Sequence, residues 1–256
     1  MKHLFLIRHC KSSWSDDALS DMDRPLNPRG LQQAAVMADP LLDNGALNGH
    51  IHVSPACRSR QSIEGILSAL PTDHPISGRV RISKKLYTFN HKDLLTWLRK
   101  RDSSVRRLTM IGHNPALSDL ARFLTGDELN DLPTGALIHI TLPVKHWKDA
   151  GKHQGKVRAV LAPTDVSHLL FRRKNNESAD LRTPEASVRI PATLTHSSRQ
   201  LQALEPGIRA GYDPEFLHQY RIHLRRSRAI ADALQAASAD HDLAQAATAL
   251  RPPAVP

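Results

Sequence analysis

The chain has few cysteines, few aromatic residues and no long hydrophobic run, and each shortage excludes a class of protein. Two cysteines in 256 residues are too few for a disulfide framework. The first apolar run ends after four residues in Arg8 and His9, which is too short for a secretion signal, and no later run reaches membrane-spanning length. The sequence therefore predicts a cytoplasmic protein with no membrane partner.

Aromatic residues make up only 4% of the chain, which argues against base stacking, and no nucleic-acid partner is expected. Neither an HExxH motif nor paired Cys/His ligand spacing occurs, so the sequence predicts no metal and no cofactor. His50 and His52 share one face of an expected strand, where solvated or core histidines are commoner than a ligand pair. The formal net charge of +10 indicates anionic partners, although charge alone does not separate phosphate substrates from polyphosphate.

Short strand-like apolar runs alternate with longer helix-like runs from residue 3 to about residue 162. This alternation is typical of an α/β domain, here with a mostly parallel sheet. Asn27 is expected to cap the first helix, and Pro40 to kink or end it early. The runs predict strands near 4–7, 51–53, 80–82, 108–111, 136–142 and 157–161, the last at a sheet edge, and helices near 28–41, 57–70, 92–101 and 116–124.

Basic side chains follow three of these strands. Arg8 and His9 come directly after the first strand, and Arg58 lies in the first turn of the helix that follows the second. His113 comes after another strand, and Gly112 is expected to allow the tight turn that brings His113 to the same edge. Ligands of open α/β sheets bind at this edge, so the three strand ends predict one site.

These residue types fit phosphoryl transfer. A phosphoryl group carries its charge on three equatorial oxygens, so catalysis is mainly positioning and stabilisation by fixed positive charges. Arg8, Arg58 and His113 would supply those charges. His9 would attack phosphorus in line and form a covalent phosphohistidine, which water later hydrolyses.

Three motifs resemble those of the histidine phosphatase superfamily, in the same order and with similar spacing. They lie at residues 6–9, 54–61 and 112–115, and further segments at 11–14, 23–30 and 132–137 resemble the SixA-type branch of phosphohistidine phosphatases. The resemblance implies a three-layer α/β/α, phosphoglycerate-mutase-like domain. It also implies that His9 is the nucleophile and that Arg8, Arg58 and His113 form the catalytic and substrate-binding phosphate pocket.

Two cysteines depart from the family pattern beside the pocket. Cys10 follows the nucleophile and Cys57 precedes Arg58. One hypothesis is that a thiol near two arginines favours the thiolate and is open to oxidation. The alternative is that both cysteines are small buried fillers.

The general acid that many relatives carry is missing, which resembles the SixA-type branch. The corresponding stretch offers only Asp93, at the start of a helix. Acidic residues at 16, 17, 21 and 23 form a loop that could reach into the site but is expected to stay in solvent. Because imidazole leaves readily without an acid, the expected substrate is a histidine-phosphorylated protein.

The sequence changes character after the phosphatase-like domain. Pro191 fits the first turn of one later helix, and Asp213 can cap a second one with Pro214 at its first position. The predicted division is a histidine phosphatase domain at 1–165, a polar linker at 166–188, a helical hairpin at 189–235 and an Ala/Pro-rich tail at 236–256.

The second helix of the hairpin carries a basic stripe beside an apolar side that begins with Leu217. The stripe consists of His218, Arg221, Arg225 and Arg228, which fall together at 100° per residue. Residues 213–226 resemble the first histidine motif of CHAD domains, helical modules associated with polyphosphate, of which only the opening helices are present. The resemblance implies polyanion binding by this stripe.

The sequence as a whole predicts a phosphohistidine phosphatase that needs no metal. The alternative is a phosphate- or polyphosphate-binding protein with a CHAD-like module and an inactive or incidental phosphatase domain. The presence of Arg8, His9, Arg58 and His113 favours the enzyme.

Overall fold

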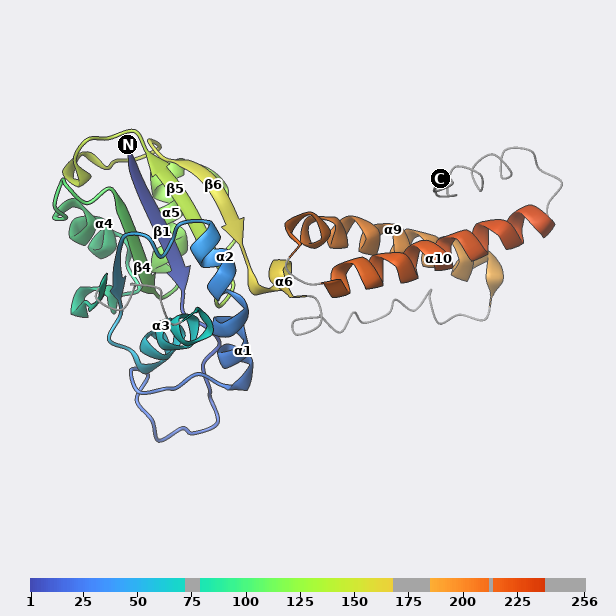
Figure 1. Ribbon diagram of the computed structural model, residues 1–256, viewed down its shortest axis with the longest axis horizontal. Helices are drawn as coiled ribbons and strands as arrows, with labels where there is room; N and C mark the ends of the chain where they lie inside the picture. Colours follow the sequence, from blue (N-terminus) through green and yellow to red (C-terminus); the bar gives the residue numbers. More distant parts are fainter. Residues whose placement is uncertain (72–78, 168–184, 212–213, 238–256) are drawn as a thin grey trace. The chain divides into compact units, whose positions relative to one another are not determined.

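The computed structural model describes residues 1–71, 79–167, 185–211 and 214–237 (Figure 1). The chain divides into two compact units, Met1–Val166 and Ser167–Pro256. The first unit contains the sheet and its covering helices. The second contains a pair of long helices.

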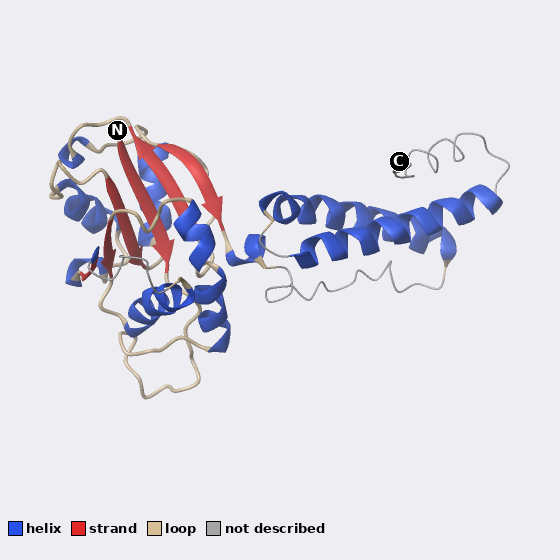
Figure 2. Ribbon diagram, in the orientation of Figure 1, coloured by secondary structure: helices blue, strands red, loops and turns tan. Residues whose placement is uncertain are grey.

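Within the described residues, the first unit is built on a six-stranded sheet in the order β3-β2-β4-β1-β5-β6 (Figure 2). The strands β1 to β4 are parallel to one another, whereas β5 is antiparallel to both β1 and β6. The strands are β1 Lys2–Arg8, β2 His50–Val53, β3 Val80–Ile82, β4 Arg107–Gly112, β5 Leu137–Leu142 and β6 Lys156–Leu161. The expected α/β fold with a mostly parallel sheet is confirmed, and β6 is an edge strand as predicted.

Helices cover both faces of this sheet and give three layers (Figure 1). The helices α4 and α5 pack on one face, where they share a hydrophobic core with β1, β4 and β5. The helices α1, α2 and α3 pack together on the other face. Their bounds are α1 Pro28–Val36, α2 Ala38–Asp43, α3 Cys57–Ala69, α4 His91–Arg99, α5 Ala116–Thr125 and α6 Pro163–Val166, with short 3-10 turns η2 Lys84–Leu86 and η3 Trp147–Asp149.

The central position of β1 explains its continuous apolar run. Leu4 and Leu6 belong to the core that α4 and α5 cover, and alternation along the strand turns Phe5 and Ile7 to the other face. All four side chains are at most 1% exposed. A strand buried on both faces needs apolar residues at every position, so the polar residues that follow it mark its end at the sheet edge.

The start and end of α1 follow from two residues. Asn27 caps the helix, because the Gly30 N–H donates to Asn27 Oδ1 at 2.8 Å. The helix ends at Val36, since Pro40 has no N–H to donate to the Val36 carbonyl, and α2 begins again at Ala38. The predicted interruption by Pro40 is confirmed.

The prediction for Gly112 is wrong. Gly112 is not among the glycines with positive φ. A Cβ there would lie 3.5 Å from the Leu86 carbonyl oxygen, which is an ordinary contact. The Gly112 carbonyl instead accepts from the His9 N–H at 3.0 Å. Ordinary strand geometry therefore brings the ends of β1 and β4 together without a special glycine conformation.

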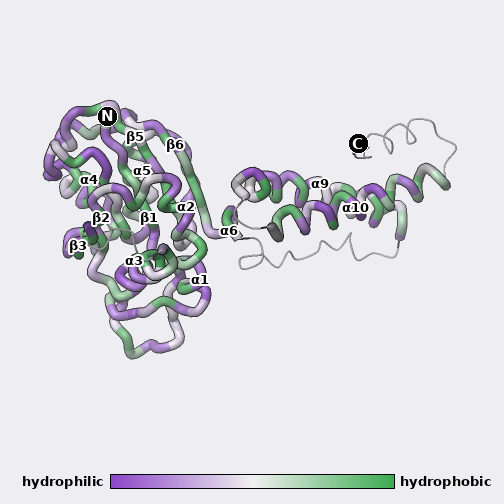
Figure 3. Tube along the Cα trace, in the orientation of Figure 1, coloured by the Kyte–Doolittle hydropathy of each residue, from purple (hydrophilic) through white to green (hydrophobic). Residues whose placement is uncertain are grey.

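The second unit contains α9 Ala186–Ala210 and α10 Pro214–Ala237, which pack against each other as a helical hairpin. Gly211 ends α9 with φ 70°, and its N–H donates to the Gly207 carbonyl at 3.1 Å. Figure 3 shows hydrophobic and hydrophilic residues interleaved along both helices, as expected of helices with one packed face. None of the described helices is long and apolar enough to cross a membrane.

Two details of the predicted hairpin are wrong. α9 starts at Ala186, so Pro191 lies in its second turn rather than its first and removes one intrahelical hydrogen bond. In α10, Phe216 is 3% exposed whereas Leu217 is 40% exposed, so the buried side begins one residue earlier than predicted. Three predictions concern residues outside the described part of the chain. They are the cap Asp213, most of the linker at 166–188 and nearly all of the tail at 236–256.

Candidate active site

His9 follows the last residue of β1 and is 8% exposed. Its Nδ1 lies 2.7 Å from the Cys10 carbonyl oxygen. Because a carbonyl can only accept a hydrogen bond, Nδ1 carries the proton and Nε2 keeps its lone pair. The Nε–H of Arg58 donates to this Nε2 at 3.2 Å. The nucleophilic nitrogen of His9 therefore faces a guanidinium group.

Arg58 connects the parts of the site. It is the second residue of α3 and is 4% exposed. Its Nη2 lies 3.2 Å from His113 Nδ1 and donates to Asp21 Oδ2 at 2.8 Å. Its Nη1 donates to the Asp21 carbonyl. At the N-terminal turn of α3, the Cys57 N–H donates to the Met22 carbonyl at 2.8 Å and the Ser59 N–H donates to the Ala56 carbonyl at 3.0 Å. The Arg58 side chain is therefore the main donor that α3 offers to an anion.

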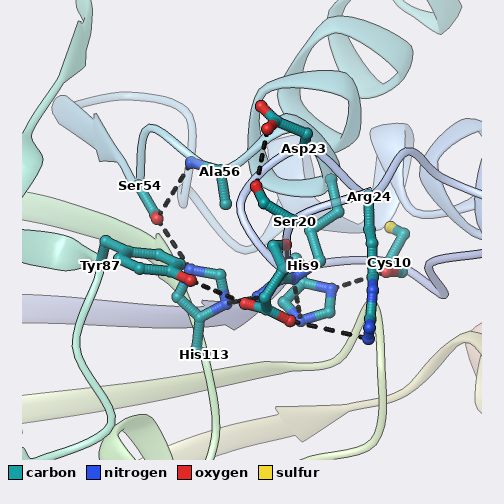
Figure 4. Close-up of polar contacts among 11 residues, drawn as sticks. His9, Cys10, Ser20, Asp23, Arg24, Ser54, Ala56, Tyr87 and His113 are labelled. Carbon is teal, nitrogen blue, oxygen red and sulfur yellow. Dashed lines mark hydrogen bonds and ion pairs between the residues drawn. The ribbon is translucent and has the colours of Figure 1, made fainter. Parts of the chain in front are cut away.

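His113 lies beside His9, with ring centroids 5.1 Å apart (Figure 4). A guanidinium can only donate, so His113 Nδ1 accepts from Arg58 and Nε2–H donates to Ser54 Oγ at 2.7 Å. The Tyr87 ring meets the His113 ring edge-on at 5.3 Å. His113 is thus fixed on both ring nitrogens and is 1% exposed.

Burial lowers the pKa of both histidines. The pKa of His9 falls to about 4, and the charges of Arg58 and Arg8 act in the same direction. Burial likewise lowers the pKa of His113 to about 3, with His9 and Arg58 adding to the shift. Both imidazoles are neutral at pH 7, which suits His9 as a nucleophile. The prediction that His113 supplies a positive charge is wrong for the free protein, because its burial next to a guanidinium disfavours protonation.

Arg8 ends β1 and is half-buried. Its Nη1 donates to the Leu132 carbonyl at 2.6 Å, and Asn114 Nδ2 donates to the same carbonyl at 3.1 Å. The buried Nε of Arg8 makes no hydrogen bond with any described residue. A buried donor without a partner is unfavourable, and a bound oxyanion would satisfy it.

The structure places Asp21 in the site, although the acidic loop was expected to stay in solvent. Asp21 Oδ2 accepts from Arg58 Nη2 and from the Tyr87 hydroxyl, each at 2.8 Å. Burial alone would raise the pKa of Asp21, but these hydrogen bonds lower it overall. Asp21 is therefore ionised at neutral pH and cannot act there as a general acid.

The other acidic residues stay outside the pocket. Asp16, Asp17 and Asp23 are exposed, as predicted. Asp93 Oδ2 accepts from Thr88 Oγ1 at 2.8 Å in the exposed first turn of α4. None of the described contacts of these carboxylates involves a residue of the pocket.

Three further residues lie near the pocket. Trp14 and Arg24 belong to segments that resemble the SixA-type branch, whereas no motif singles out Tyr87. Tyr87 contacts Asp21 and His113, as described above. Arg24 lies over the Trp14 ring at 3.7 Å, with its Nη1 3.9 Å from Asp21 Oδ1. The Trp14 side chain is 65% exposed. These residues come from loops and turns, which lack the periodicity that identifies a helix or strand.

The thiolate hypothesis is wrong for Cys10, which is instead the buried filler of the alternative. The side chain is 1% exposed, and burial raises the pKa of its thiol to about 12, so no thiolate is favoured. The Cys10 N–H donates to Ser62 Oγ at 2.9 Å, which holds the turn after His9. Cys57 is half-buried and, like Cys10, free.

The histidines of β2 do not form a ligand pair. His52 is 6% exposed, its Nδ1 lies 2.9 Å from Ser83 Oγ and its ring packs edge-on against Trp97 at 4.8 Å. His50 is exposed. Among the described residues, no three His, Cys, Asp or Glu side chains lie close enough together to hold a metal ion.

The basic stripe of the hairpin faces solvent for most of its length. His218, Arg221 and Arg225 are exposed, and Arg228 is half-buried. The four residues lie on α10, beside the side that packs against α9. This geometry leaves their charged groups available to a ligand in solution.

The two units match different families. Residues 4–81 match the histidine phosphatase superfamily (branch 1), and residues 192–254 match the CHAD domain. An uncharacterized protein of Mycobacterium tuberculosis is 28% identical over 152 residues, which are 56% of this chain and 90% of that protein.

Solved structures show the same fold in the first unit. A Nakamurella multipartitia protein assigned to the SixA phosphohistidine phosphatases has a TM-score of 0.54 at 22% identity, covering 63% of this chain and 96% of that one. The protein histidine phosphatase SixA complexed with tungstate has a TM-score of 0.54 at 23% identity, covering 64% of this chain and 99% of that one. The family match together with this shared fold supports a phosphatase.

Proposed function

We propose that this chain, whose first unit matches the histidine phosphatase superfamily and has the SixA fold, removes phosphate from histidine-phosphorylated proteins. The observation that carries the proposal is the fixed tautomer of His9. Its Nδ1–H is held by the Cys10 carbonyl, and its Nε2 lone pair points at Arg58. A neutral imidazole held in this way is an oriented nucleophile beside a fixed positive charge.

In the first step, phosphoryl oxygens accept hydrogen bonds from the N–H groups of Arg58 and from the unpartnered Nε of Arg8. The Arg58 Nε–H then turns from His9 Nε2 to the phosphoryl group, which frees the Nε2 lone pair. A P–N bond forms to Nε2 as the P–N bond of the substrate breaks. The substrate imidazole, which carries a proton on its other ring nitrogen, takes the bonding electrons and leaves as neutral imidazole.

In the second step, water attacks the same phosphorus. The bond from phosphorus to His9 Nε2 breaks, and inorganic phosphate leaves with both protons of the water as H₂PO₄⁻. His9 keeps its Nδ1 proton on the Cys10 carbonyl throughout, so it leaves phosphorus as a neutral imidazole. The cycle therefore needs no additional proton carrier.

The contacts around the pocket also support a preference among leaving groups. An alkoxide leaves only if it receives a proton, whereas imidazole has a pKa of about 6.5 and leaves readily. Among the described residues, Asp21 is the one carboxylate that contacts Arg58, and it has a lowered pKa and is ionised. Phosphohistidine and aryl phosphates should therefore be good substrates, and alkyl phosphates poor ones.

The test compares a phosphohistidine protein, an aryl phosphate and an alkyl phosphate at equal enzyme concentration. The proposal requires the first two to be hydrolysed at least about a hundredfold faster than the third, which is the rate that one general acid contributes. Wild-type activity in a His9→Ala variant would refute the mechanism. Equal rates on the alkyl phosphate would reveal an acid and reject the substrate class. We also propose that no metal is needed, so EDTA should leave the rate unchanged.

For the second unit, we propose that the stripe of His218, Arg221, Arg225 and Arg228 binds polyphosphate. The CHAD match and the exposure of three of these side chains support it. His218 and Arg228 are ten positions apart on α10, so the donors of the stripe extend over about 15 Å of the helix. Binding should weaken steeply with salt, because it depends on the release of counterions from the polyanion.

A polyphosphate titration of the full chain at low and moderate salt tests this role. An Arg221→Gln, Arg225→Gln variant should bind more weakly than wild type. An Arg189→Gln, Arg199→Gln variant is the matched control, because it removes two exposed charges from α9. Equal losses in both variants would assign the binding to overall charge rather than to the stripe.

A further inference from the structure

Two partly buried histidines lie against each other on the sheet, away from the His9 pocket. His3 in β1 and His139 in β5 have stacked rings with centroids 5.3 Å apart, and His139 also stacks on Phe5 at 4.2 Å. His3 Nδ1 and His139 Nε2 lie 3.0 Å apart, so one of these two nitrogens donates a proton to the other. Strand alternation places His3 on the face opposite Leu4.

Two arginines from neighbouring strands complete the group. Arg107 in β4 pairs in register with His3. Arg158 in β6 donates from Nε to Thr141 Oγ1 at 3.1 Å, and Thr141 in β5 also pairs in register with His3. The four adjacent strands β4, β1, β5 and β6 thus each place a basic side chain on one region of the sheet. We call His3, Arg107, His139 and Arg158 the sheet-face cluster.

The charges that act on the two imidazoles are all positive. Burial is the main cause that lowers the pKa of His3, followed by Arg107, the Met1 amino group and Arg158. Burial also lowers the pKa of His139 to about 4, and His3 and the same two arginines add to the shift. No carboxylate of the described residues is among these causes. The cluster therefore concentrates positive charge without a counter-charge from the described protein.

Several donors in the cluster remain open to a ligand. The hydrogen bonds of the described residues use one ring nitrogen of each histidine, the Nε of Arg158 and, at 3.4 Å, the Nη1 of Arg107. The other nitrogens of the cluster make no hydrogen bond with a described residue and are not buried, so they reach solvent. While both rings are neutral, one of the two open imidazole nitrogens carries a proton and the other carries a lone pair. The open imidazole N–H and the two guanidinium groups match an oxyanion with several acceptor oxygens.

A metal ion fits the cluster less well. Two imidazoles alone are fewer ligands than a stable site needs, and the described residues offer no third His, Cys, Asp or Glu. Two guanidinium charges would also repel a cation. The charges therefore favour an anion over a metal.

We propose that the sheet-face cluster is a second anion-binding site that takes a phosphate-class oxyanion. It is distinct from the proposed catalytic pocket, because His3 and His9 stand six residues apart along β1, which is about 20 Å. β1 and β4 carry the cluster at their beginnings and lead to His9 and His113 at their ends. The two sites therefore share the same two strands.

The test is a histidine NMR titration of the full chain in inorganic phosphate and in chloride at equal ionic strength. A bound dianion stabilises the imidazolium form, so phosphate should raise the pKa of His139 by about one unit relative to chloride. Arg158→Gln removes an exposed cluster residue outside the catalytic pocket and should at least halve this rise without changing phosphatase activity. Arg106→Gln is the matched control, because Arg106 is exposed and acts on Lys2, which lies on the other face.

Equal His139 pKa values in phosphate and chloride would refute the site. An equal loss in Arg106→Gln and Arg158→Gln would also refute it, since net charge would then explain the effect. A third arm of the experiment adds Zn²⁺ alone. If zinc broadens the His3 and His139 signals and phosphate does not affect them, the two histidines bind a metal ion and the anion site is refuted. A rise that depends on Arg158 and not on Arg106 supports the proposal.

Discussion

The low pKa of His9 predicts that the phosphatase keeps its nucleophile active in mild acid. With a pKa of about 4, nearly all of His9 is unprotonated at pH 5.5. With the ordinary value of 6.5, only about 9% would be unprotonated at that pH. The two cases differ by about tenfold in the fraction of reactive enzyme. Burial is the main cause of the lowered pKa, so the effect depends on an intact fold.

The acid range in which this can be measured is limited by stability. His9, His52 and His113 have folded-state pKa values of about 4, 4 and 3, below the unfolded value of 6.5. The unfolded chain therefore binds more protons between these values, and the free energy of unfolding falls as the pH drops below about 6.5. Each pKa unit corresponds to about 1.4 kcal/mol, so the protein should unfold before His9 is fully protonated.

The assay is kcat/KM for an aryl phosphate from about pH 5 to about pH 8 at constant ionic strength, corrected for ionisation of the substrate. Circular dichroism at each pH shows where the fold is retained. The account predicts a nearly constant corrected rate down to about pH 5.5. A fall to about a tenth of the full rate at that pH, with the fold intact, would contradict the buried neutral nucleophile.

Three further changes test separate parts of the structure. Asp21→Asn removes a carboxylate that competes with phosphate for Arg58, so inorganic phosphate should inhibit this variant at lower concentration, and unchanged inhibition would contradict the contact. Gly207→Ala would place a Cβ against the Phe216 ring, so the hairpin should lose about 1–3 kcal/mol of stability by thermal denaturation, with phosphatase activity unchanged. Cys10, with a thiol pKa of about 12, should resist iodoacetamide in the native protein and react after unfolding; rapid alkylation of the native protein would show that the thiol is accessible.

The parts of the fold that could be predicted from the sequence are those with local signals. The apolar run before Arg8 predicts a central strand, and the Asn27 and Pro28 pair predicts the start of α1. Because parallel strands end at one edge, the sequence also predicts that His9, Arg58 and His113 meet, and the structure brings them together. Their roles in catalysis remain a proposal.

The remaining details depend on tertiary contacts that leave no local pattern. Asp21 lies in a loop, and nothing in its neighbourhood distinguishes it from Asp23, which stays exposed. The neutral state of His113 follows from its burial beside a guanidinium, which no motif encodes. In α10, Phe216 and Leu217 are both apolar, and only packing against α9 decides which of them is buried.

The most direct test of the central claim is to trap the phosphoenzyme. Wild-type protein is mixed with a phosphohistidine protein, quenched in alkali within milliseconds and analysed by mass spectrometry and ³¹P NMR. The account predicts phosphate on His9, attached to Nε2, because Nδ1–H is held by the Cys10 carbonyl. A His9→Gln variant should trap none. Phosphate on Nδ1 of His9, on another residue, or on no residue during rapid turnover would contradict the account.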